Sequence, residues 1–273
     1  MLEEAHSPPL SLGRGMESQV RWSRNPEGKL LVFVHGFRGS STQTWGSLPN
    51  LVCLHKEAAG YDVVSFGYES VRLDAGHSAN RLHVFLNRLL VKDPTLLINR
   101  NLKDWEQGPL RDTGFTYKKS VLVGHSLGAC IIRRAFLNQL ISGDGSWPSV
   151  KQIWFAPAHR GASALRLLTA VTLGIRGGLN FSIATTYFAR VLADLKEDST
   201  FLKELHTQTE RLCVKHPQLN SPLTFWAEND AVVVNGQFAN DRTPFEEIPG
   251  TGHISICKPT GYDNRVKLLL KEL

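Results

Sequence analysis

The chain is 273 residues long, with 42% hydrophobic and 21% charged residues. This composition is typical of a folded globular domain, and it excludes a disordered or fibrous protein. The net charge of +6 comes from scattered basic residues rather than a long basic run, so we expect no nucleic-acid partner. The four cysteines lie far apart and form no C-x-x-C pair, so we expect neither a metal site nor a disulfide framework.

The N-terminal segment is polar and contains prolines and glycines, so we expect residues 1–17 to form a flexible tail. It lacks the basic and then apolar segments of a secretory signal. No stretch is apolar for long enough to cross a membrane. We therefore expect a cytoplasmic protein in which residues 18–273 form a single domain, with peripheral membrane contact and oligomeric state left open.

Apolar runs alternate with helical patterns along this domain. Such alternation predicts an α/β fold with a mainly parallel sheet and helices on both faces. The expected strands are residues 30–34, 63–66, 121–123, 151–156, 223–227 and 245–248. Four helices are expected: one that begins at about residue 42, and three that include residues 82–90, 129–140 and 264–273.

Two segments interrupt the alternation. Residues 94–117 contain asparagine, proline and glycine, which predicts a long loop. Residues 162–200 are apolar and have the pattern of helices broken by glycines at 174, 177 and 178. Long insertions at one edge of such a sheet often cover the site, so this segment is either a lid or an extra helical layer.

The most informative motif is Gly124–Gly128, which has the form G-x-S-x-G. An expected strand precedes it, and a helical pattern follows it. This context predicts a sharp strand-to-helix turn that presents Ser126 as a nucleophile and leaves the Leu127 amide at a helix N-terminus.

A serine hydroxyl is a weak nucleophile at neutral pH, so Ser126 needs a histidine base and an acid that orients the histidine. In sheets with this strand-to-helix turn, the acid and the histidine follow the serine in that order. Asp230, just after the strand at 223–227, is the predicted acid, with Glu228 as the alternative. His253, in a glycine-containing loop after the last expected strand, is the predicted base.

A tetrahedral intermediate carries a negative oxygen that needs two backbone donors. The amides of Leu127 and Phe37 are the predicted pair, since Phe37 follows the strand at 30–34. Three further histidines receive supporting roles. We expect His35 to brace its loop, and we expect His125 and His159 to lie near the site without touching the substrate.

Six tracts of the sequence carry a further signal: His35–Phe37 with Trp45, Val64–Tyr68, Gly124–Gly128, Pro157–Ala162, Asp230–Val233 and His253–Pro259. Together they resemble the serine esterase branch of the α/β-hydrolases, which includes the serine-active-site-containing proteins and the GPI inositol deacylases. The resemblance extends from about residue 29 to the C-terminus. Two departures are Ala158, which separates Pro157 from His159, and Ala129, where the family often has a second glycine.

The resemblance implies the α/β-hydrolase fold, hydrolysis of a small-molecule or lipid ester, and no cofactor. Our hypothesis is therefore a serine esterase or lipase-like enzyme that works through a Ser-His-Asp triad and an acyl-enzyme. Two alternatives stay open. One is a catalytically silent module of the same fold that binds a partner or a lipid. The other is thioester or peptide hydrolysis by the same three residues.

Overall fold

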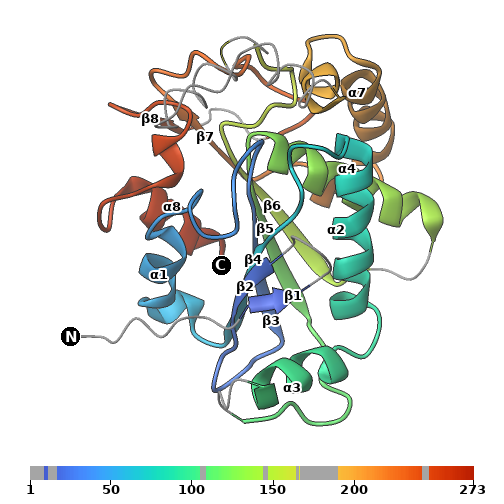
Figure 1. Ribbon diagram of the computed structural model, residues 1–273, viewed down its shortest axis with the longest axis vertical. Helices are drawn as coiled ribbons and strands as arrows, with labels where there is room; N and C mark the ends of the chain where they lie inside the picture. Colours follow the sequence, from blue (N-terminus) through green and yellow to red (C-terminus); the bar gives the residue numbers. More distant parts are fainter. Residues whose placement is uncertain are drawn as a thin grey trace.

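The fold is taken from a computed structural model that describes residues 9–11, 17–104, 109–143, 147–163, 166, 190–241 and 246–273. Within these residues eight strands form one sheet in the spatial order β1-β2-β4-β3-β5-β6-β7-β8 (Figure 1). The six strands from β4 to β8 in this order are parallel, and β2 and β1 add an antiparallel edge. The strands are β1 (Pro9–Ser11), β2 (Glu17–Arg21), β3 (Lys29–Val34), β4 (Tyr61–Phe66), β5 (Lys119–His125), β6 (Ser149–Phe155), β7 (Leu223–Ala227) and β8 (Glu246–Ile248).

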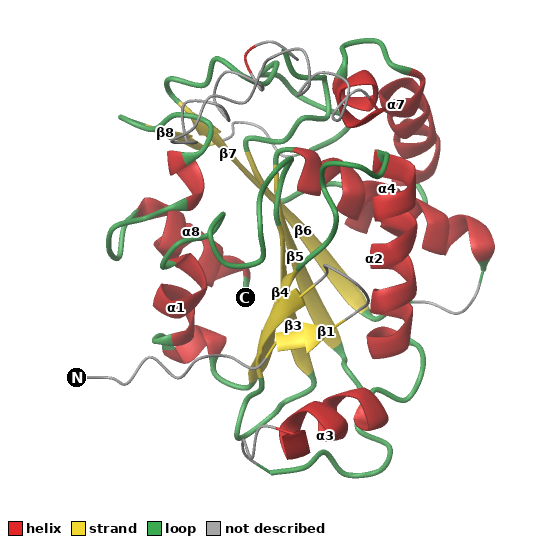
Figure 2. Cartoon of the chain, viewed as in Figure 1, coloured by secondary structure: helices red, strands yellow, loops and turns green. Residues whose placement is uncertain are grey.

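Helices cover both faces of the sheet (Figure 2). On one face lie α1 (Leu48–Cys53) and α8 (Asn264–Glu272), which contact each other. On the other face α4 (Leu127–Ser142) contacts α2 (Ala75–Leu90) and α7 (Thr200–Cys213). This arrangement confirms the expected mainly parallel sheet between two helical layers. Three short 3-10 helices are also described: η1 (Lys56–Ala58), η2 (Pro217–Leu219) and η3 (Ser255–Cys257).

The central strands are buried on both sides. Residues 30–34 of β3 are completely inaccessible to solvent, and so are the three apolar residues at 121–123 in β5. Full burial explains why these strands are continuous apolar runs instead of alternating patterns. Strand β3 pairs with β4 on one side and with β5 on the other, so the winding of the chain reverses between β3 and β5. In open α/β sheets, ligands bind beyond the carboxyl ends of the strands at such a reversal.

The long loop expected at residues 94–117 was wrong in its first part, because α3 (Thr95–Asp104) occupies it. The asparagines that indicated a loop have specific partners here. Asn101 accepts a hydrogen bond from the Trp22 ring nitrogen at 2.7 Å, and Asn99 exchanges two hydrogen bonds with the backbone of Arg111. These contacts outweigh the low helix propensity of asparagine.

Two other boundaries differ from expectation, and one further helix, α7, was not expected from the sequence. Part of the expected tail, Pro9–Ser11, is strand β1 and pairs with β2. The helix expected from about residue 42 begins at Leu48, after a series of turns. Helix α7 begins at the end of the expected insertion and has a buried apolar face that includes Leu202 and Leu205.

Most of the insertion at 162–200 lies outside the described residues, including the glycines at 174, 177 and 178. Its two ends are described and are anchored to the domain. Ala162 forms an antiparallel bridge with Val233, and the Ala162 amide donates to the Leu195 carbonyl at 2.8 Å. The expectation that the insertion is a lid or an extra layer stays a prediction.

A buried ion pair joins α4 to the loop after β7. One guanidinium nitrogen of Arg133, which is fully buried, lies 2.7 and 2.6 Å from the two carboxylate oxygens of Asp241. The guanidinium also lies 4.8 Å from the centre of the Phe238 ring and 5.2 Å from that of Trp154. Because α4 begins immediately after Ser126, this pair fixes the helix that follows the turn at Ser126.

We predict that Asp241→Asn lowers the free energy of unfolding by about 3–5 kcal/mol, because it leaves a buried guanidinium without its counter-charge. Asp198→Asn is the matched control. The Lys203–Asp198 pair is 3.7 Å long with side chains 64% and 84% exposed, so its loss should cost below about 1 kcal/mol. Urea unfolding followed by circular dichroism measures both. Equal losses of unfolding free energy in the two variants would show that the buried pair stabilises the fold no more than the exposed pair does.

Candidate active site

The turn between β5 and α4 holds Ser126 in an uncommon backbone conformation, with φ 52° and ψ −121°. Residues with a Cβ are held in this region only when the surrounding structure fixes them. Here the Ser126 amide donates to the Phe155 carbonyl at 3.0 Å, and the Ser126 carbonyl accepts from the amides of Ala129 and Ala158. The strain is therefore held by hydrogen bonds to two neighbouring segments.

The two glycines of the motif are required by contact with backbone. A Cβ on Gly124 would lie 2.6 Å from the Ala129 Cα, and a Cβ on Gly128 would lie 2.1 Å from the Val34 carbonyl oxygen. Neither neighbour is a flexible side chain that could move away. The motif residues are thus fixed by the close approach of α4 to β5 and to the end of β3.

Ser126, His253 and Asp230 form a continuous hydrogen-bonded line. The His253 Nε2 atom lies 3.0 Å from Ser126 Oγ, and Nδ1 lies 2.8 Å from Asp230 Oδ2. The Asp230 side chain is fully buried and that of His253 is 7% exposed. A carboxylate only accepts, so Nδ1 carries the proton and the Nε2 lone pair faces the serine hydroxyl.

The other Asp230 oxygen accepts hydrogen bonds from the amides of Val232 and Val233, at 2.8 and 3.2 Å. Burial acts to raise the pKa of Asp230, but the hydrogen bond from His253 and these two amides outweigh burial and lower the pKa. The carboxylate is therefore ionised and fixed in orientation. The alternative acid, Glu228, points to a different partner, since its carboxylate accepts from the Gly250 amide at 2.7 Å.

The two predicted oxyanion donors lie at neighbouring strand ends. Leu127 is the first residue of α4, and the first amides of a helix have no acceptor within the helix. Phe37 lies in the loop after β3, next to Gly36. A Cβ added to Gly36 would lie 2.9 Å from the Ser126 Cβ. The loop that carries Phe37 therefore lies directly against the serine.

His35 braces this loop, in the place that the sequence indicated. Its Nδ1 donates to the Gly36 carbonyl at 2.9 Å, and its ring stacks on Tyr68 with centres 4.2 Å apart. The Tyr68 hydroxyl donates to the His35 carbonyl at 2.8 Å. Burial lowers the pKa of His35 to about 4, so it stays neutral at physiological pH.

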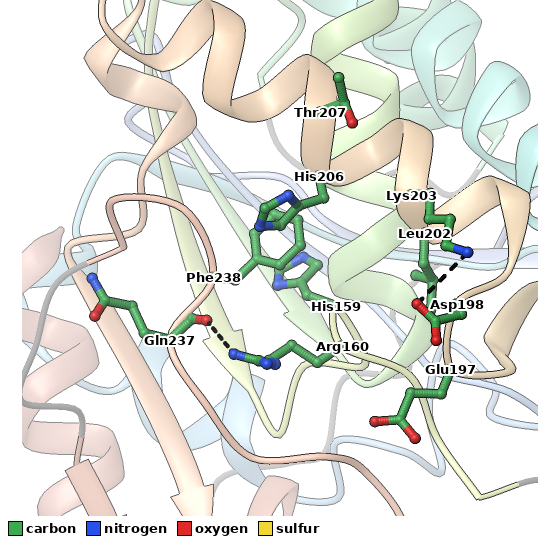
Figure 3. A pocket seen from close by; sticks show the side chains of 10 residues that line it. All are labelled: His159, Arg160, Glu197, Asp198, Leu202, Lys203, His206, Thr207, Gln237 and Phe238. Atoms are coloured by element: carbon green, nitrogen blue, oxygen red, sulfur yellow. Dashed lines mark hydrogen bonds and ion pairs between the residues drawn. The ribbon is translucent and has the colours of Figure 1, made fainter.

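His125 and His159 lie in different surroundings. His125 Nε2 is 2.9 Å from the main-chain carbonyl of His253, which places it beside the hydrogen-bonded line of Ser126, His253 and Asp230. His159 instead forms part of the lining of a cavity of about 340 Å³ between α7 and the loop after β7 (Figure 3). His159 packs against Phe238 there, with ring centres 4.7 Å apart, and Arg160 and Lys203 lie at the same cavity. No sequence motif pointed to this cavity, because its lining comes from three distant segments.

Within the described part of the chain, no group of three or more His, Cys, Asp or Glu residues is arranged to hold a metal ion. Among the same residues, no helix is both long enough and apolar enough to span a membrane.

Sequence comparison identifies the family. The model of the family described as "Alpha/beta hydrolase family" matches residues 31–257, which is most of the chain. The chain belongs to the alpha/beta hydrolase family. No curated protein sequence matches the chain.

Solved structures share the fold at low sequence identity. A mature lipase from Bacillus licheniformis has a TM-score of 0.54 and 17% identity, covering 93% of this chain and 97% of that one. A peroxisomal alpha-beta-hydrolase from Saccharomyces cerevisiae has a TM-score of 0.52 and 14% identity, covering 97% and 82%. A monoacylglycerol lipase from Paleococcus ferrophilus has a TM-score of 0.50 and 15% identity, covering 94% and 97%. These likenesses show the α/β-hydrolase fold.

The buried histidines predict how stability depends on pH. Burial lowers the pKa from 6.5 to about 4 for His35 and to about 3 for His125. Between these values the unfolded chain binds protons that the folded chain excludes, so stability is fully present above pH 6.5 and falls as the pH decreases toward 4. We expect the urea midpoint to fall over this range and His35→Gln to reduce the slope. A His35→Gln protein with the wild-type slope would contradict this account.

Proposed function

We propose that this alpha/beta hydrolase is a cofactor-independent serine hydrolase that cleaves carboxylic esters. One observation carries the proposal: Asp230, His253 and Ser126 are connected by hydrogen bonds of 2.8 and 3.0 Å in the order that nucleophilic catalysis needs. The three residues come from three separate loops, so their alignment is not a local consequence of sequence. The strained turn at Ser126 supports the same conclusion, because strain of this kind is concentrated at functional sites.

In the proposed reaction, Ser126 Oγ attacks the ester carbonyl carbon while His253 Nε2 takes the hydroxyl proton. Asp230 stabilises the imidazolium that forms. The amides of Phe37 and Leu127 donate to the oxyanion, and the positive end of α4 adds to its stabilisation. His253 then gives its proton to the leaving alcohol, and the acyl group stays on Ser126. A water molecule activated by His253 releases the acid and regenerates the serine.

The proposal includes lipid esters among the substrates. Two of the structural neighbours are described as a lipase and a monoacylglycerol lipase. The sequence resemblance to the serine esterase branch points to the same substrate class. Thioester or peptide hydrolysis uses the same residues, and a panel of short-chain esters, thioesters and amides separates these reactions by their kcat/KM.

We predict that Ser126→Ala lowers kcat for p-nitrophenyl ester hydrolysis by about a thousandfold or more, because it removes the nucleophile. The variant should keep the wild-type circular dichroism spectrum and melting temperature. A fluorophosphonate probe should label the wild-type protein at Ser126, identified by mass spectrometry, and should not label the variant. A folded wild-type protein that neither reacts with the probe nor hydrolyses esters would favour a catalytically silent binding module instead.

We predict that Asp230→Asn lowers kcat by roughly a thousandfold or more with a much smaller change in KM, because the histidine loses the partner that fixes its tautomer. Glu228→Gln is the matched control, since an amide oxygen can still accept from the Gly250 amide. This control should keep kcat near the wild-type value. If Glu228→Gln is inactive and Asp230→Asn is active, the acid is assigned to the wrong residue.

A further inference from the structure

His125 connects the strand end that carries Ser126 to the loop that carries His253. Its side chain is buried, and its Nε2 lies 2.9 Å from the main-chain carbonyl oxygen of His253. A carbonyl oxygen only accepts, so Nε2 carries the proton and donates. His125, which directly precedes Ser126 in the sequence, therefore holds the backbone of His253, whose ring faces the Ser126 hydroxyl.

The opposite edge of the His125 ring meets the loop that carries Phe37. A Cβ on Gly36 would lie 3.1 Å from His125 Nδ1, so the Gly36 backbone is in close contact with the ring. Trp45 approaches the ring edge-on, with centres 6.4 Å apart. The imidazole thus fills the space between the loop after β3 and the loop after β8, and both of these loops contribute to the proposed site.

The His253 imidazole needs this support because Asp230 holds only one of its ring atoms. The hydrogen bond at Nδ1 leaves the ring able to turn about that contact, and it does not fix the position of the His253 backbone. A displacement of about 1 Å of a reacting group can cost roughly a hundredfold in rate. The contact to the His253 carbonyl constrains the backbone and so restricts where Nε2 can lie relative to Ser126 Oγ.

The charge state of His125 suits this role. Burial, followed by the charge of the neighbouring His253, lowers the pKa of His125 to about 3. The two rings lie 4.9 Å apart, and a cationic His125 would repel the imidazolium that forms on His253 during the reaction. A neutral His125 keeps its donor and avoids this repulsion.

We propose that His125 is a positioning residue that holds the His253 imidazole in register with Ser126 by donating a hydrogen bond to the His253 main-chain carbonyl. The proposal rests on the serine hydrolase function proposed above. It assigns His125 neither proton transfer nor substrate contact.

Three variants at this position separate hydrogen bonding from space filling. His125→Gln keeps a side-chain amide donor with nearly the reach of Nε2. His125→Asn keeps an amide that is too short to reach the carbonyl, and His125→Met fills the space without a donor. His83→Met is the control for losing a buried imidazole elsewhere, because His83 bonds to Gln139 between α2 and α4 at 2.9 Å.

The measurements are kcat and KM with p-nitrophenyl butyrate, the rate of fluorophosphonate labelling at Ser126, and the melting temperature. We expect His125→Met and His125→Asn to lower kcat and the labelling rate roughly 10- to 100-fold, with KM within about threefold of wild type. We expect His125→Gln to stay within about threefold of wild type, and His83→Met to lower the melting temperature without lowering kcat.

Two outcomes in the variants at position 125 would overturn the positioning role: wild-type kcat in folded His125→Met, or equal loss of kcat in the Gln, Asn and Met variants. Failure of the proposed function has a different signature, because the wild-type protein itself would then show neither labelling nor hydrolysis. A loss of kcat in His83→Met as large as that in His125→Met would assign the effect to general destabilisation and would also overturn the proposal.

Discussion

The geometry of the site depends on one contact between two pieces of backbone, where the first turn of α4 lies against the end of β3. A Cβ on Gly128 would be 2.1 Å from the Val34 carbonyl oxygen and 2.5 Å from that of His35. This contact fixes the distance between the Leu127 amide and the loop that carries Phe37. Because backbone meets backbone, side-chain rotation cannot alter that distance. The spacing of the two predicted oxyanion donors is therefore a property of how the chain winds, and it is set before any substrate binds.

The winding of the sheet brings the remaining groups to the same edge. Strands β3 and β5 are neighbours although a whole β-α unit separates them in the sequence, and the loops after them meet beyond their carboxyl ends. Asp230 lies in the loop after β7 and His253 in the loop after β8. Hydrogen bonds connect Asp230 to His253 and His253 to Ser126. Strands β3, β5, β7 and β8 thus each contribute one loop, and these loops meet at Ser126.

How much the sequence could predict follows from how local each signal is. The Ser126 turn, its flanking strand and its helix are adjacent in sequence. The helical spacing of apolar residues and the spacing of the two glycines were therefore sufficient to predict them. The central strands were recognisable because full burial makes them apolar throughout. Helix α3 was missed because its asparagines have tertiary partners, Trp22 and the Arg111 backbone, that no local pattern reveals. The cavity beside His159 and the contact of His125 with His253 were beyond reach for the same reason, since each joins segments from distant parts of the chain.

The surroundings of the three histidines near the site, His35, His125 and His253, determine the hydrogen-bond partners that each one has. His35 and His125 are buried, and their pKa values are lowered to about 4 and about 3, so both remain neutral donors and acceptors. Each is engaged with main-chain carbonyl groups, of Gly36 and His253 respectively. His253 alone of the three has a carboxylate on one ring nitrogen and a hydroxyl on the other. A proton taken from Ser126 therefore has one site that a negative charge stabilises. The two neutral imidazoles hold the geometry, and they do so without placing positive charge beside the histidine that is proposed to become cationic.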